Sequence, residues 1–171
     1  MRPKLLPLKR RGEEKTNYKR RLALLKSKMP RIAARITNNF VTLQVVEYAP
    51  SGAIGSSDKT TFAFTSKKLE GMGWKHSKNS IPACYLSGLY FGLFCKKNKV
   101  KGAVFDMGVA RKTTGNRYFA VLKGLADSGL EVPMSDEKMP SDDRLSGRHI
   151  SEDVSKDFEA VKQKILDNYG K

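Results

Sequence analysis

Residues 31–48 of the chain are RIAARITNNFVTLQVVEY, and this stretch decides the fold. Its first six residues alternate with a period of two, which is typical of a β-strand with one apolar face and with Arg31 and Arg35 on the other face. Phe40–Tyr48 forms a second, β-branched segment, and Asn38-Asn39 between the two suits a tight turn with positive φ. The stretch therefore predicts an antiparallel hairpin.

The segments that follow predict an α/β fold. Thr60–Thr65 alternates like a third strand, and a largely apolar run predicts a buried helix over about residues 80–98. Gly102–Val109 then predicts a short buried strand, and Arg117–Ser128 predicts another helix. The order βββαβα predicts a mixed sheet, in which one parallel strand joins a three-stranded antiparallel meander and helices pack on the sheet. Small residues along the first helix predict that it packs closely against the sheet: Ala83, Ser87, Gly88 and Gly92.

Two terminal segments flank this core, so the chain divides into residues 1–30, 31–133 and 134–171. Residues 1–14 predict an extended basic arm, because prolines and a glycine oppose helix formation and the cations repel one another. A short charged helix is expected over residues 17–28. Residues 131–150 show no period and predict a surface loop, and Ser151–Asn168 predicts an amphipathic terminal helix.

The charge of the chain indicates its class of partner. The 171 residues include 33 Lys and Arg against 17 Asp and Glu, a net charge of +16, and 39% are apolar, enough for a folded core. Residues 1–40 carry a net +11, residues 41–130 a net +8 and residues 131–171 a net −3. This distribution is typical of a protein that binds a polyanion. An anionic membrane is the competing polyanion, but the charged helix has only a narrow apolar stripe, and no apolar run is long enough to span a bilayer. We therefore expect a cytoplasmic protein that binds nucleic acid and no membrane.

Acidic and nucleophilic residues are too sparse to predict an enzyme. Asp106 at a strand end and Glu47 in another strand suggest a metal-dependent nuclease, but two-metal catalysis needs several convergent carboxylates. Between residues 41 and 130 there are only five acidic residues, and the first strand carries arginines instead. Cys84 and Cys95 are too few for a disulfide framework or a zinc site, and free thiols are expected. We expect no catalytic residue, no metal and no cofactor.

Two basic segments outside the arm are candidate RNA contacts. Arg111, Lys112 and Arg117 surround a loop just before a helix N-terminus, where free amides, the helix dipole and cations favour a phosphate. A second segment places an aromatic ring among cations, as RNA-stacking surfaces do: Trp74, Lys75 and Lys78. A single tryptophan is as often a core anchor, so both interpretations of the ring stay open.

Several motifs occur in the order found in one ribosomal family. They are YKRRLALL at residues 18–25, Pro30-Arg31, RITN at residues 35–38, IPACYLSGLYFG at residues 81–92, VFDMG at residues 104–108, FAVLKGLADSGLEVP at residues 119–133 and GRHI at residues 147–150. Through them the chain, over about residues 9–150, resembles the archaeal and eukaryotic branch of large-subunit ribosomal protein eighteen. The resemblance implies a structural protein that binds 5S ribosomal RNA and helps to attach it to the large subunit in the central protuberance. It also implies a ribonuclease-H-like core without catalysis.

The resemblance further implies which partners and residues take part. The partners are 5S rRNA, large-subunit rRNA and neighbouring large-subunit ribosomal proteins. The RNA contacts that carry over are Lys9, Arg10, Arg11, Tyr18, Arg20, Arg21, Arg31, Arg35, Asn38, Arg111, Lys112 and Arg117. The residues themselves leave other classes open, namely an RNA-processing nuclease, a free-standing RNA-binding module and an architectural DNA-binding protein.

Overall fold

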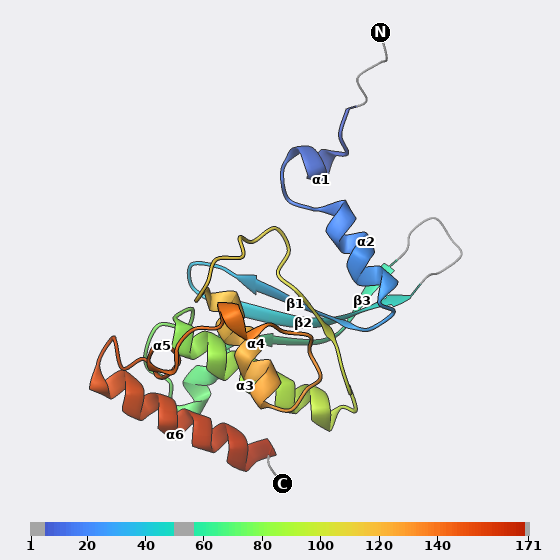
Figure 1. The fold of residues 1–171 in the computed structure, drawn as a ribbon. Coiled ribbons are helices and arrows are strands. Elements are labelled where there is room, and N and C mark those ends of the chain that lie inside the picture. The colour runs from blue at the N-terminus through green and yellow to red at the C-terminus, as the bar shows by residue number, and fades with distance from the viewer. Residues whose placement is uncertain (1–5, 50–56, 170–171) are drawn as a thin grey trace.

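The predicted strands form one mixed sheet in the computed structural model, which describes residues 6–49 and 57–169. The strands are β1 (Arg31–Ile36), β2 (Val41–Ala49), β3 (Ser57–Thr65) and β4 (Val104–Asp106). Their order is β3-β2-β1-β4, with antiparallel pairing of β1 to β2 and of β2 to β3, and parallel pairing of β1 to β4. The meander with one added parallel strand is thereby confirmed (Figure 1).

The turn between β1 and β2 differs from the predicted one. The Thr37 N–H donates to the Phe40 carbonyl at 2.9 Å, and the Thr37 hydroxyl donates to the same carbonyl and accepts from the Phe40 N–H. Neither Asn38 nor Asn39 has a positive φ, so that prediction is wrong. The reason is that the Thr37 side chain closes a four-residue loop, which needs no left-handed residue.

Helices cover one face of the sheet in two layers (Figure 1). α3 (Ile81–Lys97) and α4 (Arg117–Asp127) lie against the sheet, and α6 (Glu152–Tyr169) packs on α3. Each of the three begins and ends within about two residues of the predicted helix, the usual spread at helix ends. None of the helices in the described ranges has the length and apolar character needed to cross a membrane.

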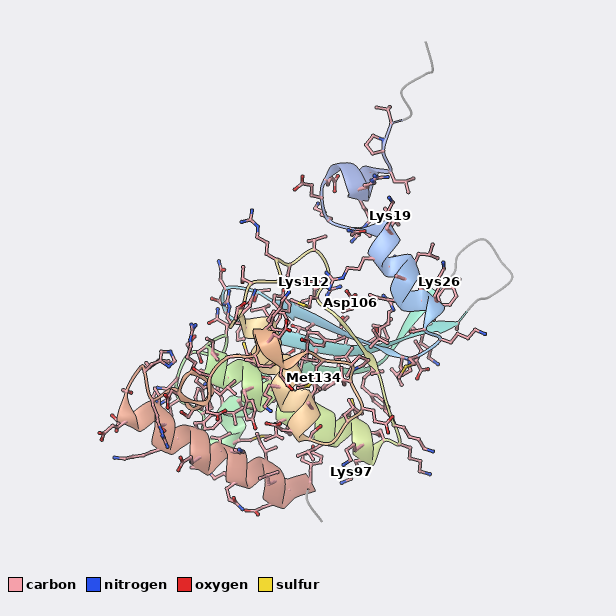
Figure 2. All side chains as sticks on the ribbon, in the orientation of Figure 1. Lys19, Lys26, Lys97, Asp106, Lys112 and Met134 are labelled. Atoms are coloured by element: carbon pink, nitrogen blue, oxygen red, sulfur yellow. The ribbon has the colours of Figure 1, made fainter. Side chains whose placement is uncertain are left out.

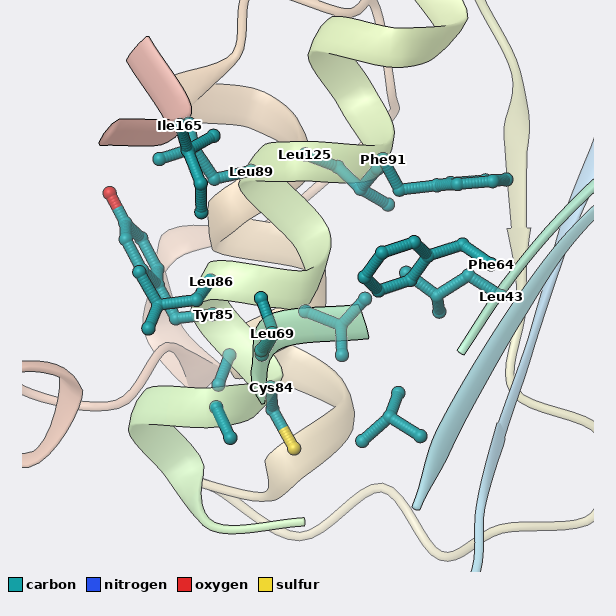
Figure 3. Close-up of a cluster of buried hydrophobic side chains, with 14 of the residues drawn as sticks. Leu43, Phe64, Leu69, Cys84, Tyr85, Leu86, Leu89, Phe91, Leu125 and Ile165 are labelled. Atoms are coloured by element: carbon teal, nitrogen blue, oxygen red, sulfur yellow. The ribbon is translucent and has the colours of Figure 1, made fainter. Parts of the chain in front are cut away.

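The core lies between the sheet and α3. Leu43 of β2 and Phe64 of β3 project toward the helix layer, where Phe91 of α3 meets the Phe64 ring at a centroid distance of 6.3 Å (Figure 3). Ile165 of α6 is fully buried on the other side of α3, beside Leu89 (Figure 3). Full burial of such a side chain contributes about 1.5–3 kcal/mol to stability.

The small residues of α3 face a helix rather than the sheet. A Cβ atom added to Gly88 would lie 2.2 Å from the Val121 carbonyl oxygen of α4, and one added to Gly92 would lie 2.0 Å from the Ser128 hydroxyl. On α4, a Cβ at Gly124 would lie 2.3 Å from the Tyr85 carbonyl oxygen. α3 does lie against the sheet, but the prediction is wrong in the partner of Gly88 and Gly92, because glycines on both helices let the backbones of α3 and α4 touch.

Both terminal segments contain more helix than the sequence predicts. In the arm, Lys9–Gly12 form α1, a single turn without buried residues, followed by α2 (Tyr18–Lys26). Residues 131–150 contain a 3₁₀ turn at Asp136–Lys138 and α5 (Asp142–Ser146). Outside the terminal segments, an unpredicted 3₁₀ helix spans Ser66–Met72, between β3 and α3. Buried Leu145 and Leu69 anchor two of these short helices to the core, although their segments show no helical period.

Candidate nucleic-acid interface

A groove lies between α2, the β1 end of the sheet and the loop after β4, and we call it the arm groove. Its volume is about 410 Å³. Its basic lining residues are Arg10, Lys15, Arg20, Arg21, Arg31 and Arg35, and its acidic lining residues are Asp58 and Asp106. Thr16, Asn17, Tyr118 and residues 107–110 complete the lining. Six cations against two carboxylates make this groove strongly attractive to an anion.

The local sequence places α2 at the groove. The Asn17 side chain caps the helix by accepting the Arg20 N–H at 3.0 Å. The side chains of Arg20 and Arg21 then bind the helix to the sheet and to the loop after β4. Arg20 Nη1 donates to the Gly108 carbonyl at 2.8 Å, and Arg21 Nη2 donates to Asp58 Oδ2 on β3 at 2.5 Å. Because no residue of α2 is fully buried, these polar contacts help to orient the helix, together with partly buried Leu24 and Leu25.

Arg31 lies beneath the groove and is only 5% exposed. Its Nη2 is 2.8 Å from Asp58 Oδ2, and its Nη1 is 3.8 Å from Asp106 Oδ2. The protein's own carboxylates are thus the partners of Arg31 here, and the expectation that it contacts phosphate stays a prediction. The two carboxylates balance the buried charge of Arg31, whereas Arg31 Nε and Asp58 Oδ1 are buried without a hydrogen-bond partner in the described part of the chain.

Arg35, four residues further along β1, remains accessible. Its side chain is 48% exposed, although Nη2 lies 3.2 Å from Asp106 Oδ2 and Nη1 donates to the Asp106 carbonyl at 3.0 Å. A guanidinium has five N–H donors, so these contacts leave donors for a second anion. The partners fix the side chain while its outer edge faces the arm groove.

Asp106, the carboxylate that a nuclease would use, serves the backbone and the arginines. Its Oδ1 accepts the Gly108 N–H at 2.8 Å, in a turn where Gly108 has φ +63°. Its other oxygen faces Arg31 and Arg35. In Figure 2, Asp106 lies between α2, which carries Lys19 and Lys26, and the loop that carries Lys112.

A second hollow of about 430 Å³ adjoins the arm groove along α2. It is lined by Arg11, Glu14, Thr16, Asn17, Tyr18, Lys19 and Val109. Val109 is shared with the arm groove and is 56% exposed, so it stands between the two hollows. Together the hollows bring five predicted contacts of the arm and helix to one place: Arg10, Arg11, Tyr18, Arg20 and Arg21. Lys9 lies exposed at the start of α1, beside this region in sequence but outside the lining of either hollow.

The predicted phosphate loop lines a separate, shallower cleft of about 600 Å³, which we call the loop cleft. Arg117 lies there with Asn79 and Arg144, and its Nη1 contacts the Asn79 carbonyl at 3.5 Å. Arg111 and Lys112 are exposed on the same loop, and the Asn116 side chain holds the loop by donating to the Arg111 carbonyl at 3.1 Å.

Asn38 is exposed in the hairpin turn beside the loop cleft, and its carbonyl accepts from the Asn79 side chain. Its own side chain is at the surface, next to Asn79 of that cleft. The turn thus adjoins the loop cleft through Asn79, although Asn38 itself lines neither that cleft nor the arm groove.

The stacking interpretation of Trp74 is wrong. The ring is 1% exposed, its Nε1 donates to the Ser77 carbonyl at 3.1 Å, and it packs edge-on against His76. A base cannot reach a ring enclosed in this way. Lys78 forms an ion pair with Glu70 and lies 5.5 Å from the Phe40 ring centre, whereas Lys75 is exposed.

Sequence reasoning missed several lining residues. Lys15 follows the basic arm, and its charge alone makes it a candidate, whereas Asp58 lies on β3, which begins three residues before the predicted strand. Arg144 lies on unpredicted α5, and Tyr118 reaches the groove from α4. No periodic signal in the sequence indicates that these side chains converge.

The two thiols lie away from both hollows, in the core. Burial raises the pKa of Cys84 and that of Cys95 to about 12, from an ordinary value of 9.0. Burial, with the neighbouring Tyr169 hydroxyl, likewise raises the pKa of Tyr90 to about 12. These groups are neutral at physiological pH and belong to the packing of α3.

Comparison with known proteins identifies relatives of the chain. A family model described as "Ribosomal large subunit proteins 60S L5, and 50S L18" matches residues 93–135. The chain is 38% identical, over 193 aligned residues, to the "Large ribosomal subunit protein uL18" of Ignicoccus hospitalis, with 96% of this chain and 92% of that protein covered. It is 41% identical to the uL18 protein of Korarchaeum cryptofilum over 143 residues, with 84% of this chain and 71% of that protein covered.

Proposed function

Because the chain belongs to the uL18 family of large ribosomal subunit proteins, we propose that it binds 5S rRNA and helps to attach it to the large subunit in the central protuberance. Its role is that of a structural constituent of the cytoplasmic ribosome. Large-subunit rRNA and neighbouring large-subunit ribosomal proteins are its further partners.

The arm groove is the observation that supports RNA binding. Half-exposed guanidinium groups of Arg21 and Arg35 approach it from α2 and β1, and Arg10 and Lys15 approach it from the arm. Arginine suits this work, because its planar fork can bond two phosphate oxygens at once. Each phosphate that these cations neutralise releases counterions, which drives association.

The loop cleft provides a second RNA contact in this proposal. Arg111, Lys112 and Arg117 present positive charge beside the N-terminus of α4, where backbone amides and the helix dipole favour a phosphate. Asn38 is available there to an unpaired base, and Tyr18 offers a half-buried ring beside the arm. The protein binds the RNA without a chemical step: contacts to phosphates position the RNA, and contacts to bases add specificity.

We assign no enzymatic activity to the chain. Asp106 is bonded to Arg35 and to the Gly108 amide, and Asp58 is bonded to Arg21 and Arg31, so the acids of the groove serve to hold arginines. We also propose that the core is ribonuclease-H-like, as the family resemblance implies. The strand order supports this proposal, because β1 lies inside the sheet and pairs in parallel with β4.

A titration with three nucleic acids tests the proposed function. The purified protein is titrated at one salt concentration with 5S rRNA, tRNA and duplex DNA, because affinities at different salt cannot be compared. We expect the tightest binding to 5S rRNA, with no cleavage of the RNA in magnesium. Equal affinity for duplex DNA indicates an architectural DNA-binding protein instead, and magnesium-dependent cleavage indicates a nuclease.

A further inference from the structure

An alternating chain of five charges connects α2 to the sheet. In order, its members are Arg21, Asp58, Arg31, Asp106 and Arg35. The two terminal arginines are 40% and 48% exposed in their side chains, whereas the central Arg31 is buried. This row of five charged side chains therefore has an accessible cation at each end, and the charge of the buried arginine in the middle is balanced by the two carboxylates.

Asp58 is the member that joins the helix to the sheet. Its Oδ2 accepts from Arg21 at 2.5 Å and lies 2.8 Å from Arg31 Nη2. β3 fixes its backbone, since Asp58 pairs with Tyr48 in the β2–β3 ladder. α2 has no fully buried residue and only partly buried Leu24 and Leu25 on its apolar side, so polar contacts such as this one help to fix its position at the groove.

We propose that Asp58 is a positioning residue for RNA binding, which holds the Arg21 guanidinium, and with it α2, in the orientation that phosphate requires. This inference rests on the proposed function. Holding a long side chain in place before binding removes part of the entropic cost of ordering it on RNA. Arg21 uses Nη2 for Asp58, and its remaining N–H donors stay available for a phosphate.

The proposal and simple electrostatics predict opposite changes in RNA affinity when the charge of Asp58 is removed. Asp58 places a negative charge beside a groove that attracts a polyanion, so charge alone predicts tighter RNA binding when that charge is removed. Positioning predicts weaker binding, because Arg21 is then free to leave the groove. The sign of the change in affinity therefore separates the two mechanisms.

The test measures 5S rRNA affinity for Asp58→Asn in two backgrounds, the natural chain and Arg21→Gln. We expect Asp58→Asn to weaken binding about tenfold in the natural chain, the scale of one lost charge-assisted contact. In the Arg21→Gln background it should leave the affinity unchanged or raise it, since there is no arginine left to position. Asp58→Glu, which keeps the charge, should restore most of the affinity.

A matched control and a folding control accompany the test. Glu47→Gln removes an acid from neighbouring β2 that forms no ion pair in the described part of the chain, and it should leave the affinity equal or higher. Thermal melting reports folding. If Asp58→Asn alone unfolds because Arg31 loses a partner, the pair Arg31→Gln with Asp58→Asn replaces it, since that pair leaves no unmatched charge at this contact.

Two results overturn the proposal. One is equal or tighter binding of folded Asp58→Asn in the natural chain, and the other is the same loss of affinity in both backgrounds. Either result leaves the proposed function intact as long as the natural chain prefers 5S rRNA. A natural chain without that preference contradicts the proposed function instead, and the sign of the Asp58 effect is then still measurable with tRNA.

Discussion

Arg35 keeps about half of its side chain in solvent, while Arg31, on the same strand and the same face, is buried between Asp58 and Asp106. Alternation along β1 places both arginines opposite the core, as the sequence predicts. What separates them is the acid that β3 brings over Arg31, together with α2 above it. One residue therefore stabilises the fold, and the other is free to meet RNA.

Alanine substitution should distinguish the two arginines. Arg35→Ala should weaken 5S rRNA binding about tenfold. It should change stability by less than about 1 kcal/mol, because its ion pair is half exposed. Arg31→Ala should destabilise the fold by about 1–3 kcal/mol, since it removes a buried charge-assisted contact with Asp58, while Arg21 and Arg35 stay beside the two carboxylates. Melting temperature measured beside RNA affinity checks both expectations, and a normal melting temperature for Arg31→Ala contradicts this account of the ion pairs.

The raised thiol pKa values predict how the cysteines react. With pKa values near 12, about one thiol in ten thousand is ionised at pH 8, against about one in ten at the ordinary value of 9.0. Cys84 and Cys95 should therefore resist a thiol reagent in the native protein and react at once in about 6 M urea, since urea solvates the exposed core. Between pH 7.5 and 9 the slow native labelling should rise about tenfold per pH unit without levelling off, whereas labelling of an exposed thiol levels off as the pH reaches its pKa of 9.0. Rapid labelling of either cysteine in the folded chain contradicts their burial.

At the scale of elements, the crossing of α3 and α4 depends on backbone contact at glycines. A methyl group at Gly88 has no space beside the Val121 carbonyl, whereas one at Gly71, in the 3₁₀ helix, meets no atom within 4 Å. Both positions lie outside the left-handed region of backbone conformation, so the comparison isolates packing. The crossing is thus specified by two or three positions rather than by the broad apolar surface of α3.

Gly88→Ala should cost at least about 2 kcal/mol of stability, because the core must shift to admit the methyl group. For a chain of this size that corresponds to a melting temperature lower by about 4–8 °C. Gly71→Ala serves as the control and should melt like the natural protein. Equal melting temperatures for the two variants contradict the close helix crossing.

The sequence predicts elements well where one signal dominates. α3, α4 and α6 have strong apolar patterns and clear stops, and β1 and β2 alternate or carry β-branched residues. Prediction fails where a single tertiary contact decides. Leu145 anchors α5 in a segment without period, and Thr37 replaces the expected asparagine turn. The partner of the small residues of α3 likewise depends on where α4 lies.

The arm should contribute to RNA affinity without contributing to the fold. Deletion of residues 1–14 removes five cations, Arg2, Lys4, Lys9, Arg10 and Arg11, against two acids, and α1 contains no buried residue. The slope of log affinity against log salt should become shallower by about 2–4. The melting temperature of the protein without RNA should stay the same. An unchanged salt slope shows that the arm makes no phosphate contacts.

Over the whole molecule, the fold places the basic and the acidic segments of the chain on opposite sides. α1 and α2 lie on one side of the sheet, whereas α6, from the acidic end of the chain, lies beyond the helix layer on the opposite side (Figure 1). Residues 1–40 carry a net +11 and residues 131–171 a net −3. Such asymmetry orients the protein as it approaches a polyanion, with the arm groove foremost.

The sequence predicts the class of partner from the net charge better than it predicts which side chains of the site are accessible. Composition indicates a polyanion partner, and the family motifs indicate where RNA contacts fall, but neither shows that Arg31 is neutralised or that Trp74 is enclosed. Both outcomes depend on residues distant in the chain, Asp58 for the arginine and the surroundings of the 3₁₀ helix for the ring. Long-range pairing of this kind leaves no periodic signal in a single sequence.

Photocrosslinking from Val109 tests most directly whether 5S rRNA occupies the arm groove. Val109 is exposed and stands between the two hollows beside the arm, so replacing it with benzoylphenylalanine places a photoreactive group at the expected RNA surface. The same replacement at exposed Gln163 on α6 is the matched control on the far side of the helix layer. We predict that 5S rRNA crosslinks efficiently from position 109 and not from position 163. Crosslinking from position 163 alone, or equally from both positions, contradicts the arm groove as the RNA-binding surface.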